Sequence, residues 1–311
     1  MTDPALTLEK TPPGRHPDHD ILMQHPQRRV VGDWIINGVV VLLGVAIVVA
    51  VATNDRFGWN IAFEWFFSHR LVTGLLRTFE LTAISMAIGI VLGIALALAR
   101  TASNRMLNGA AGVFVWFFRG VPVFVQLLFW GFIAALYPHI GPWSANQLIS
   151  PFMAAILGLG LNESAYMSEI VRAGLLSVPN GQAEAARSLG LRRFTTFRTV
   201  TLPQAMRFIV PPTGNQTISM LKTTSLVSVL AFPELLYSAQ VVYSQNYQTI
   251  PLLIAASAWY LIVTSVLSFG QMLIERHYGR GDRGRSPGRS SGRSSGRSLT
   301  SRGPSLRRKR A

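Results

Sequence analysis

Long apolar segments with few charges alternate with polar segments along most of this 311-residue chain. The first runs from Trp34 to Ala52, and nineteen uncharged residues are enough for a helix to cross the hydrocarbon core of a bilayer, which is about 30 Å thick. Further spans are predicted at 81–99, 111–137, 151–171, 208–232 and 251–274. The pattern predicts an all-α membrane protein with six transmembrane helices.

Arginine is distributed unevenly over the segments that connect these spans. Segments 100–110, 172–207 and 276–311 carry an arginine excess, whereas the connections near 138 and 236 carry no Arg or Lys. Because positively charged loops stay in the cytoplasm, these three segments and both chain termini are expected to be cytoplasmic. An even number of spans agrees with that orientation.

The two ends of the chain have compositions that cannot form a hydrophobic core. Residues 1–33 are polar, and their scattered His and Asp residues suggest either a metal site or, as we favour, a disordered cytoplasmic leader before an extra transmembrane helix at 34–53. Residues 279–311 hold ten Arg and one Lys against one Asp, that is +10 of the chain's net +15. We interpret them as a disordered basic cytoplasmic tail. Such a tail could bind nucleic acid, but its tethering at the membrane favours anionic lipid headgroups.

The polar segment between the predicted fourth and fifth spans has an ordered pattern. It contains Glu-Ala-Ala-Arg-Ser-Leu-Gly at 184–190, then nine residues, then Val-Thr-Leu-Pro at 200–203. A helix is expected to start near Pro179-Asn180, and Gly190 suits the left-handed backbone position that ends a helix. A second short helix follows, and Pro203 opens the next one. This spacing resembles the EAA loop of type-1 ABC transporter permeases, which docks on the ATP-hydrolysing subunit.

Three further segments resemble signatures of one branch of these permeases, the one that takes up histidine, glutamine, glutamate, arginine and opines. They read Phe-Arg-Gly-Val-Pro-Val-Phe-Val-Gln at 118–126, Ala-Tyr-Met-Ser-Glu-Ile-Val-Arg-Ala-Gly at 165–174 and Leu-Lys-Thr-Thr-Ser-Leu at 221–226. The resemblance covers about residues 72–275. Where the family usually has Lys-Asp-Thr-Ser, this chain has Lys-Thr-Thr-Ser at 222–225, so no ion-pair role is carried over to that position.

The resemblance implies a type-1 ABC importer transmembrane domain at 72–275, with cytoplasmic coupling helices in the EAA loop at 180–203. The chain would be the permease subunit of an importer for a polar amino acid in a bacterial cytoplasmic membrane. The residues implied in ATPase coupling are Glu184, Ala185, Ala186, Gly190, Leu202 and Pro203. The implied partners are two ABC ATPases, an extracytoplasmic amino acid-binding protein and a second permease chain, identical or related.

The chain is not expected to hydrolyse ATP itself, because it has no glycine-rich phosphate loop ending in Gly-Lys-Ser/Thr. ATP and Mg²⁺ would be used by the partner ATPase, and we expect no cofactor, metal or nucleic acid on this chain. It has no cysteine, which excludes thiolate metal sites.

Polar residues inside the predicted spans are candidates for the substrate path. A charge in the middle of a bilayer costs about 2.5–3.5 kcal/mol even on the membrane-insertion scale, which gives the lowest values. Such a charge must therefore face protein or water and usually has a partner. The candidates are Arg119, Gln126, Glu163, Glu169, Lys222, Thr223 and Thr224. Helix packing explains Arg119 and Glu169 equally well, whereas the depth of Glu163 and Lys222 suits a cavity. The mixed charges suit a zwitterion but do not select one amino acid.

Two other classes of protein fit the pattern less well. A secondary transporter or channel driven by an ion gradient predicts an internal repeat, and none is found. An intramembrane enzyme would need paired catalytic groups, and no such pair stands in the spans.

Overall fold

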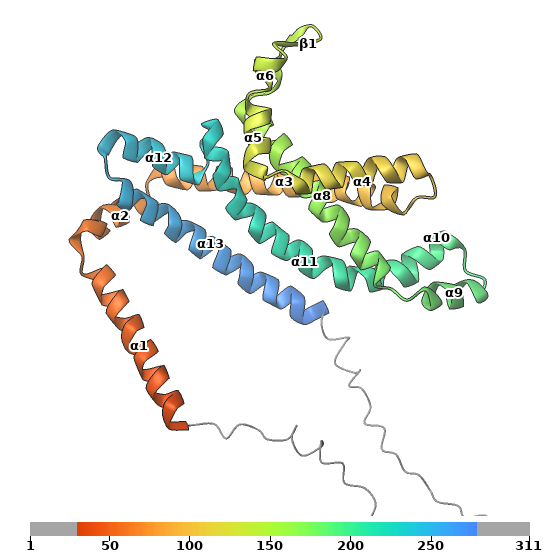
Figure 1. Ribbon diagram of the computed structural model, residues 1–311, viewed down its shortest axis with the longest axis horizontal. Coiled ribbons are helices and arrows are strands. Elements are labelled where there is room, and N and C mark those ends of the chain that lie inside the picture. The colour runs from red at the N-terminus through yellow and green to blue at the C-terminus, as the bar shows by residue number, and fades with distance from the viewer. Residues whose placement is uncertain (1–29, 279–311) are drawn as a thin grey trace, which may run out of the picture. The chain divides into compact units, whose positions relative to one another are not determined.

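The computed structural model describes residues 30–278, which divide into two compact units at Trp59–Asn60 (Figure 1). In the first unit, helix α1 (Val30–Ala52) is followed by the short 3-10 helix η3 (Asp55–Phe57). The side chain of Asn54 accepts a hydrogen bond from the Arg56 amide at 3.0 Å and so caps η3. The Trp59 indole N–H donates to the Val51 carbonyl at 3.2 Å, which ties the end of this unit to the last turn of α1. The predicted leader and tail lie outside the described residues.

The second unit is helical apart from one small hairpin. Its first half contains α2 (Trp59–Phe66), α3 (His69–Thr101), α4 (Arg105–Gly120), α5 (Val123–Gly131), α6 (Ile133–Leu136), β1 (His139–Ile140), β2 (Trp143–Ser144), α7 (Ala145–Leu148) and α8 (Pro151–Leu176). The two strands pair antiparallel, with His139 opposite Ser144. Its second half contains α9 (Asn180–Ser188), α10 (Arg193–Thr196), the π-helix η4 (Phe197–Thr201), α11 (Leu202–Thr223), the 3-10 helix η5 (Thr224–Leu230), α12 (Leu235–Asn246) and α13 (Thr249–Tyr278).

Three helical segments in the described part of the chain are long and apolar enough to cross a membrane. They are Trp34–Ala52 in α1, the whole of α3 and the whole of α13. The number rises to five if each of two bent pairs counts as one span, α4 with α5 and α10–η5 with α12. Helix α8 is not among them, because its second half is rich in polar residues. The sequence pattern predicts six spans, and that number stays a prediction.

The predicted span at 111–137 is broken in the structure. Helix α4 ends at Gly120, α5 begins at Val123, and the two axes differ by 99° (Figure 1). Pro122 explains the break, because proline has no N–H to donate and its ring clashes with the preceding helical turn. At this elbow between α4 and α5, the side-chain amides of Gln126 and Asn162 donate hydrogen bonds to the backbone carbonyls that the break leaves free.

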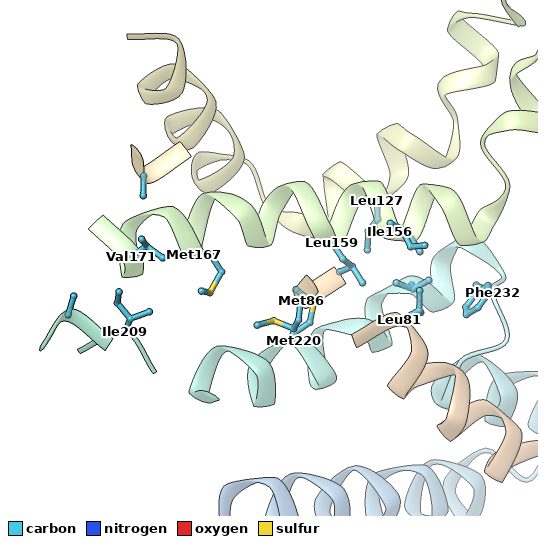
Figure 2. Packing of buried hydrophobic residues seen from close by; sticks show 14 of the residues in the cluster. Leu81, Met86, Leu127, Ile156, Leu159, Met167, Val171, Ile209, Met220 and Phe232 are labelled. Carbon is cyan, nitrogen blue, oxygen red and sulfur yellow. The ribbon is translucent and has the colours of Figure 1, made fainter. Parts of the chain in front are cut away.

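Helix α8 contacts α3, α4, α5 and α11, so it lies at the centre of the second unit. Small residues allow α3 to approach it closely: a Cβ added at Gly89 would lie 2.5 Å from Cγ of Glu163, and one at Gly93 would lie 2.5 Å from Cβ of Met167. A side chain at either position would therefore force α3 and α8 apart. Figure 2 shows the buried side chains along this interface, where Met86, Leu159 and Met220 meet from three helices.

Candidate substrate pocket and coupling segment

A cavity of about 460 Å³ opens beside the elbow between α4 and α5. Its wall is formed by Arg119, Gly120, Val121, Pro122, Val123, Leu159, Asn162, Glu163, Tyr166, Gln216, Met220 and Thr223. The α8 residues among them are spaced i, i+3, i+4 and i+7, and the α11 residues i, i+4 and i+7. Each set therefore lies along one face of its helix, and both faces meet at the elbow.

Glu163 is the buried charge of this pocket, with 1% of its surface exposed. Its Oε2 accepts a hydrogen bond from Nε2 of Gln216 on α11 at 3.0 Å. Its Oε1 has no hydrogen-bond partner, and no cation lies within ion-pair distance of the carboxylate, among residues 34–278. A carboxylate that is buried with only a neutral partner is costly, so the site is suited to a cationic group from outside.

Arg119, at the end of α4, belongs to a cluster around Glu169. The Glu169 carboxylate accepts hydrogen bonds from Arg100, at the end of α3, and from Nε and Nη2 of Arg172 at 3.1 and 2.8 Å. Nη1 of Arg119 lies farther away, 3.8 Å from Oε1 of Glu169. Its guanidinium carbon lies 5.3 Å from the ring centroid of Tyr166, a cation–π distance. The cluster thus joins α3, α4 and α8 at the edge of the pocket.

Two side-chain amides hold the elbow between α4 and α5 by hydrogen bonds to its backbone carbonyls. Nε2 of Gln126 donates to the carbonyls of Phe118 and Val121 at 3.0 and 2.8 Å, and Nδ2 of Asn162 donates to the Phe118 carbonyl at 2.7 Å. These carbonyls would otherwise lack partners where the helix stops. Gln126 therefore fixes the shape of the pocket without lining it.

The structure brings only some of the candidate path residues to the pocket. Arg119, Glu163 and Thr223 line the pocket, and Glu169 adjoins it through Arg119. Thr224 is buried and donates to the Leu221 carbonyl at 2.6 Å.

Lys222 is exposed and is not among the residues of the pocket wall. Sequence reasoning did not single out Asn162, Tyr166, Gln216 and Met220. Asn162 directly precedes Glu163 and Tyr166 follows it by about one helical turn, so both are recognisable in the sequence as polar neighbours of Glu163. Gln216 is 53 residues from Glu163, and only the fold brings them together.

The coupling segment has the predicted glycine stop and the predicted second short helix, α10, and Pro203 lies in the first turn of the next helix, α11. Gly190 has φ +83°, so its left-handed conformation is confirmed. After α10 the chain continues through the π turn of η4 directly into α11. Pro203 accounts for this turn, because it cannot donate the i→i−4 bond that a regular α-helix requires at that position. The chain is therefore continuously helical from α10 into α11, which carries Gln216, Met220 and Thr223.

Most but not all of the predicted coupling residues are exposed in this segment. Ala186 is 6% exposed and packs within the chain, whereas Glu184, Ala185 and Pro203 are exposed and Leu202 is half-buried. Two large apolar side chains project outward, Leu189 at 84% and Phe194 at 73% exposure. Exposed apolar side chains beside charged ones are typical of a protein-binding surface.

Comparison with known proteins shows the family of this chain. Residues 89–279 match the family described as binding-protein-dependent transport system inner membrane component. The chain belongs to that family. As such it is a membrane permease component of an ABC importer, in which separate subunits hydrolyse ATP.

Several relatives of this permease have named substrates. It is 42% identical over 266 residues to the arginine transport system permease protein ArgU of Corynebacterium glutamicum, covering 83% of this chain and 82% of the relative. It is 36% identical to the glutamine permease GlnP of Escherichia coli, over 71% of this chain and 97% of the relative. It is 37% identical to the L-cystine permease TcyB of Bacillus subtilis, over 74% and 95%.

Solved structures agree with the fold. The permease superposes on a chain of an amino acid ABC transporter crystallised with histidines, with a TM-score of 0.61 and 34% identity, over 67% of this chain and 94% of that one. It also superposes on a chain of the MetNI methionine ABC transporter, with a TM-score of 0.53 and 20% identity, over 67% and 95%. The type-1 importer fold of the transmembrane domain is thereby confirmed.

Proposed function

We propose that this permease imports a polar amino acid and that the substrate passes through the cavity beside Glu163. The relatives transport arginine, glutamine and cystine, whose side chains differ in charge and length. What these substrates share is an α-ammonium and an α-carboxylate group. A cavity whose wall carries one carboxylate, Glu163, and one guanidinium, Arg119, offers a partner to each of them. The presence of these two opposite charges on the wall of one cavity is the observation that supports the proposal.

The segment 180–203 is proposed as the surface that receives the ATPase. Its exposed face combines Glu184 with the apolar side chains of Leu189 and Phe194, which can enter a groove of a partner. When ATP closes the ATPase pair, the shift of this segment passes through η4 into α11, and a rigid-body movement changes the access to the cavity. ATP and Mg²⁺ are bound by the ATPase, not by this chain.

The working assembly we propose has two permease chains, identical or related, two ATPases and an extracytoplasmic amino acid-binding protein. The chain lies in a bacterial cytoplasmic membrane with both termini and the segment 180–203 in the cytoplasm. The basic tail at 279–311 adds attraction to anionic lipids of the inner leaflet.

Reconstitution tests the proposal. The permease is co-expressed with its ATPase, purified and placed in proteoliposomes with the cognate binding protein, and uptake of labelled arginine, glutamine and cystine is measured. We expect uptake of at least one that requires ATP inside the vesicles and the binding protein outside. Uptake that follows an ion gradient without ATP would instead identify a secondary transporter. ATP-driven uptake confined to compounds other than amino acids would refute the substrate class.

A further inference from the structure

Arg119 is the arginine of the Glu169 cluster that has room for another anionic partner. The Oε1 atom of Glu169 accepts from Arg100, and its Oε2 atom accepts from two nitrogens of Arg172. Arg119 stands 3.8 Å from this carboxylate, beyond ordinary hydrogen-bond distance, and its side chain is 44% exposed against 23% for Arg100. Its interaction with Glu169 is therefore the weakest of the three.

The charges of the cluster do not balance. Among the described residues, three guanidinium groups face the single carboxylate of Glu169. Of the three, only Arg119 belongs to the wall of the pocket, where the ring of Tyr166 lies under its guanidinium. A planar guanidinium held against a ring can still bind a carboxylate with two parallel hydrogen bonds.

Glu163, on the wall of the same cavity, is an anion without a cationic partner among the described residues. Its Oε1 atom is buried and lacks a hydrogen-bond partner in the part of the chain that the structure describes, and its neighbour Gln216 brings no charge. Its stem already packs against α3 at Gly89, where an added Cβ would stand 2.5 Å from the Glu163 Cγ, so the side chain has no room to move away toward α3. Thus an uncompensated carboxylate and an incompletely paired guanidinium, from α8 and α4, line one space of about 460 Å³.

We propose that Arg119 gives up its contact with Glu169 and binds the α-carboxylate of the substrate instead, while Glu163 binds the α-ammonium. This proposal rests on the proposed function. The groups common to all amino acids are thereby fixed, and the side chain is left to the neutral part of the wall at Asn162, Gln216 and Thr223. The exchange also removes one ion-pair contact between α4 and α8, so an occupied pocket differs from an empty one in the link between these helices.

Equilibrium binding to the purified permease–ATPase complex tests this directly, without the binding protein and its own selectivity. The probes are L-arginine, agmatine, which lacks the carboxylate, and 5-guanidinopentanoate, which lacks the α-ammonium. If glutamine binds in place of arginine, L-glutamine, 4-aminobutanamide and glutaramate serve in the same way. The wild-type complex should bind each analogue at least about tenfold more weakly than the amino acid, since each loses a charged hydrogen-bond pair.

The variants separate the two contacts. Arg119→Gln should weaken arginine binding by about tenfold to a hundredfold and leave agmatine binding unchanged, so that the preference for the carboxylate disappears. Glu163→Gln should abolish the preference for arginine over 5-guanidinopentanoate and keep the preference over agmatine. Glu169→Gln should raise the ratio of arginine to agmatine affinity by up to about fivefold, because Arg119 no longer has a competing partner.

Arg172→Gln is the matched control, because it removes an arginine of the same cluster that is not part of the pocket wall. Its ratio of arginine to agmatine affinity should equal that of the wild type. Gel filtration verifies assembly of every variant, and ratios within one variant cancel a general loss of binding-competent protein. The proposal is overturned if Arg119→Gln keeps the wild-type ratio, if Arg172→Gln lowers it equally, or if Glu169→Gln leaves it unchanged. A wild-type complex that binds none of the amino acids would instead refute the proposed function.

Discussion

The close contact between α3 and α8 at Gly89 can be tested by adding a single methyl group, which should change both stability and substrate binding. In Gly89→Ala the new Cβ would stand 2.5 Å from Cγ and 2.9 Å from Cβ of Glu163. The Cβ of Glu163 is not the end of a flexible chain, so the two helices must separate. Overpacking of this kind costs about 1–3 kcal/mol, while replacing a helical glycine by alanine returns at most about 1 kcal/mol. With about 1 kcal/mol returned, we expect a net destabilisation of up to about 2 kcal/mol.

Two other glycines make the comparison quantitative. Gly112, in α4, has no atom within 4 Å of its added Cβ, so Gly112→Ala should be neutral or stabilising by up to about 1 kcal/mol. Gly93→Ala strains the same interface one turn away, with the new Cβ 2.5 Å from Cβ of Met167. It should lower stability as Gly89→Ala does. Only Gly89→Ala should in addition weaken substrate binding, because it displaces the carboxylate of Glu163.

The assay is thermal unfolding of the purified permease–ATPase complex, followed by loss of the monodisperse gel-filtration peak, together with amino acid binding at a temperature at which all variants are folded. Equal melting temperatures for Gly89→Ala and Gly112→Ala would refute the packing argument. Equal loss of binding in Gly89→Ala and Gly93→Ala would show that Glu163 is no more sensitive to this contact than the interface as a whole.

Three further predictions address the coupling segment, the orientation and a strained turn. Gly190→Val should cost about 1–2 kcal/mol at its φ of +83°, leave membrane insertion normal and reduce the ATPase recovered by co-purification; undiminished recovery would argue against docking through this segment. Because the chain has no cysteine, single cysteines can be introduced, and an impermeant thiol reagent applied to intact cells should label Gln147→Cys and Gln245→Cys. Labelling of Arg193→Cys instead would show that the chain has the opposite orientation. Ala231→Gly should raise the melting temperature by relieving a φ of +56° worth about 1 kcal/mol, and an unchanged or lower value would show that the turn is not strained.

Several features were determined by the sequence alone, because they depend on residues that are near each other in the chain. The apolar runs predict the long helices of α1, α3 and α13, since a helix in lipid must satisfy its own backbone groups. The left-handed stop at Gly190 follows from local conformational preference. The spacing at 184–203 and at 118–126 was sufficient to indicate the family before any fold was known.

Other features were decided by tertiary structure, because they depend on contacts between distant residues. Gln216 reaches Glu163 across 53 residues, and Arg100 reaches Glu169 across 69. Hydrophobic pattern cannot show which of several polar residues in apolar helices share a cavity: Glu163 and Lys222 have similar predicted depth, yet one is buried in the pocket and the other is exposed. Nor can the pattern show that Ala186 faces its own chain while Leu189 faces outward. Helix direction after a break such as Pro122 is set by the helices against which the next segment packs, and those helices come from elsewhere in the chain.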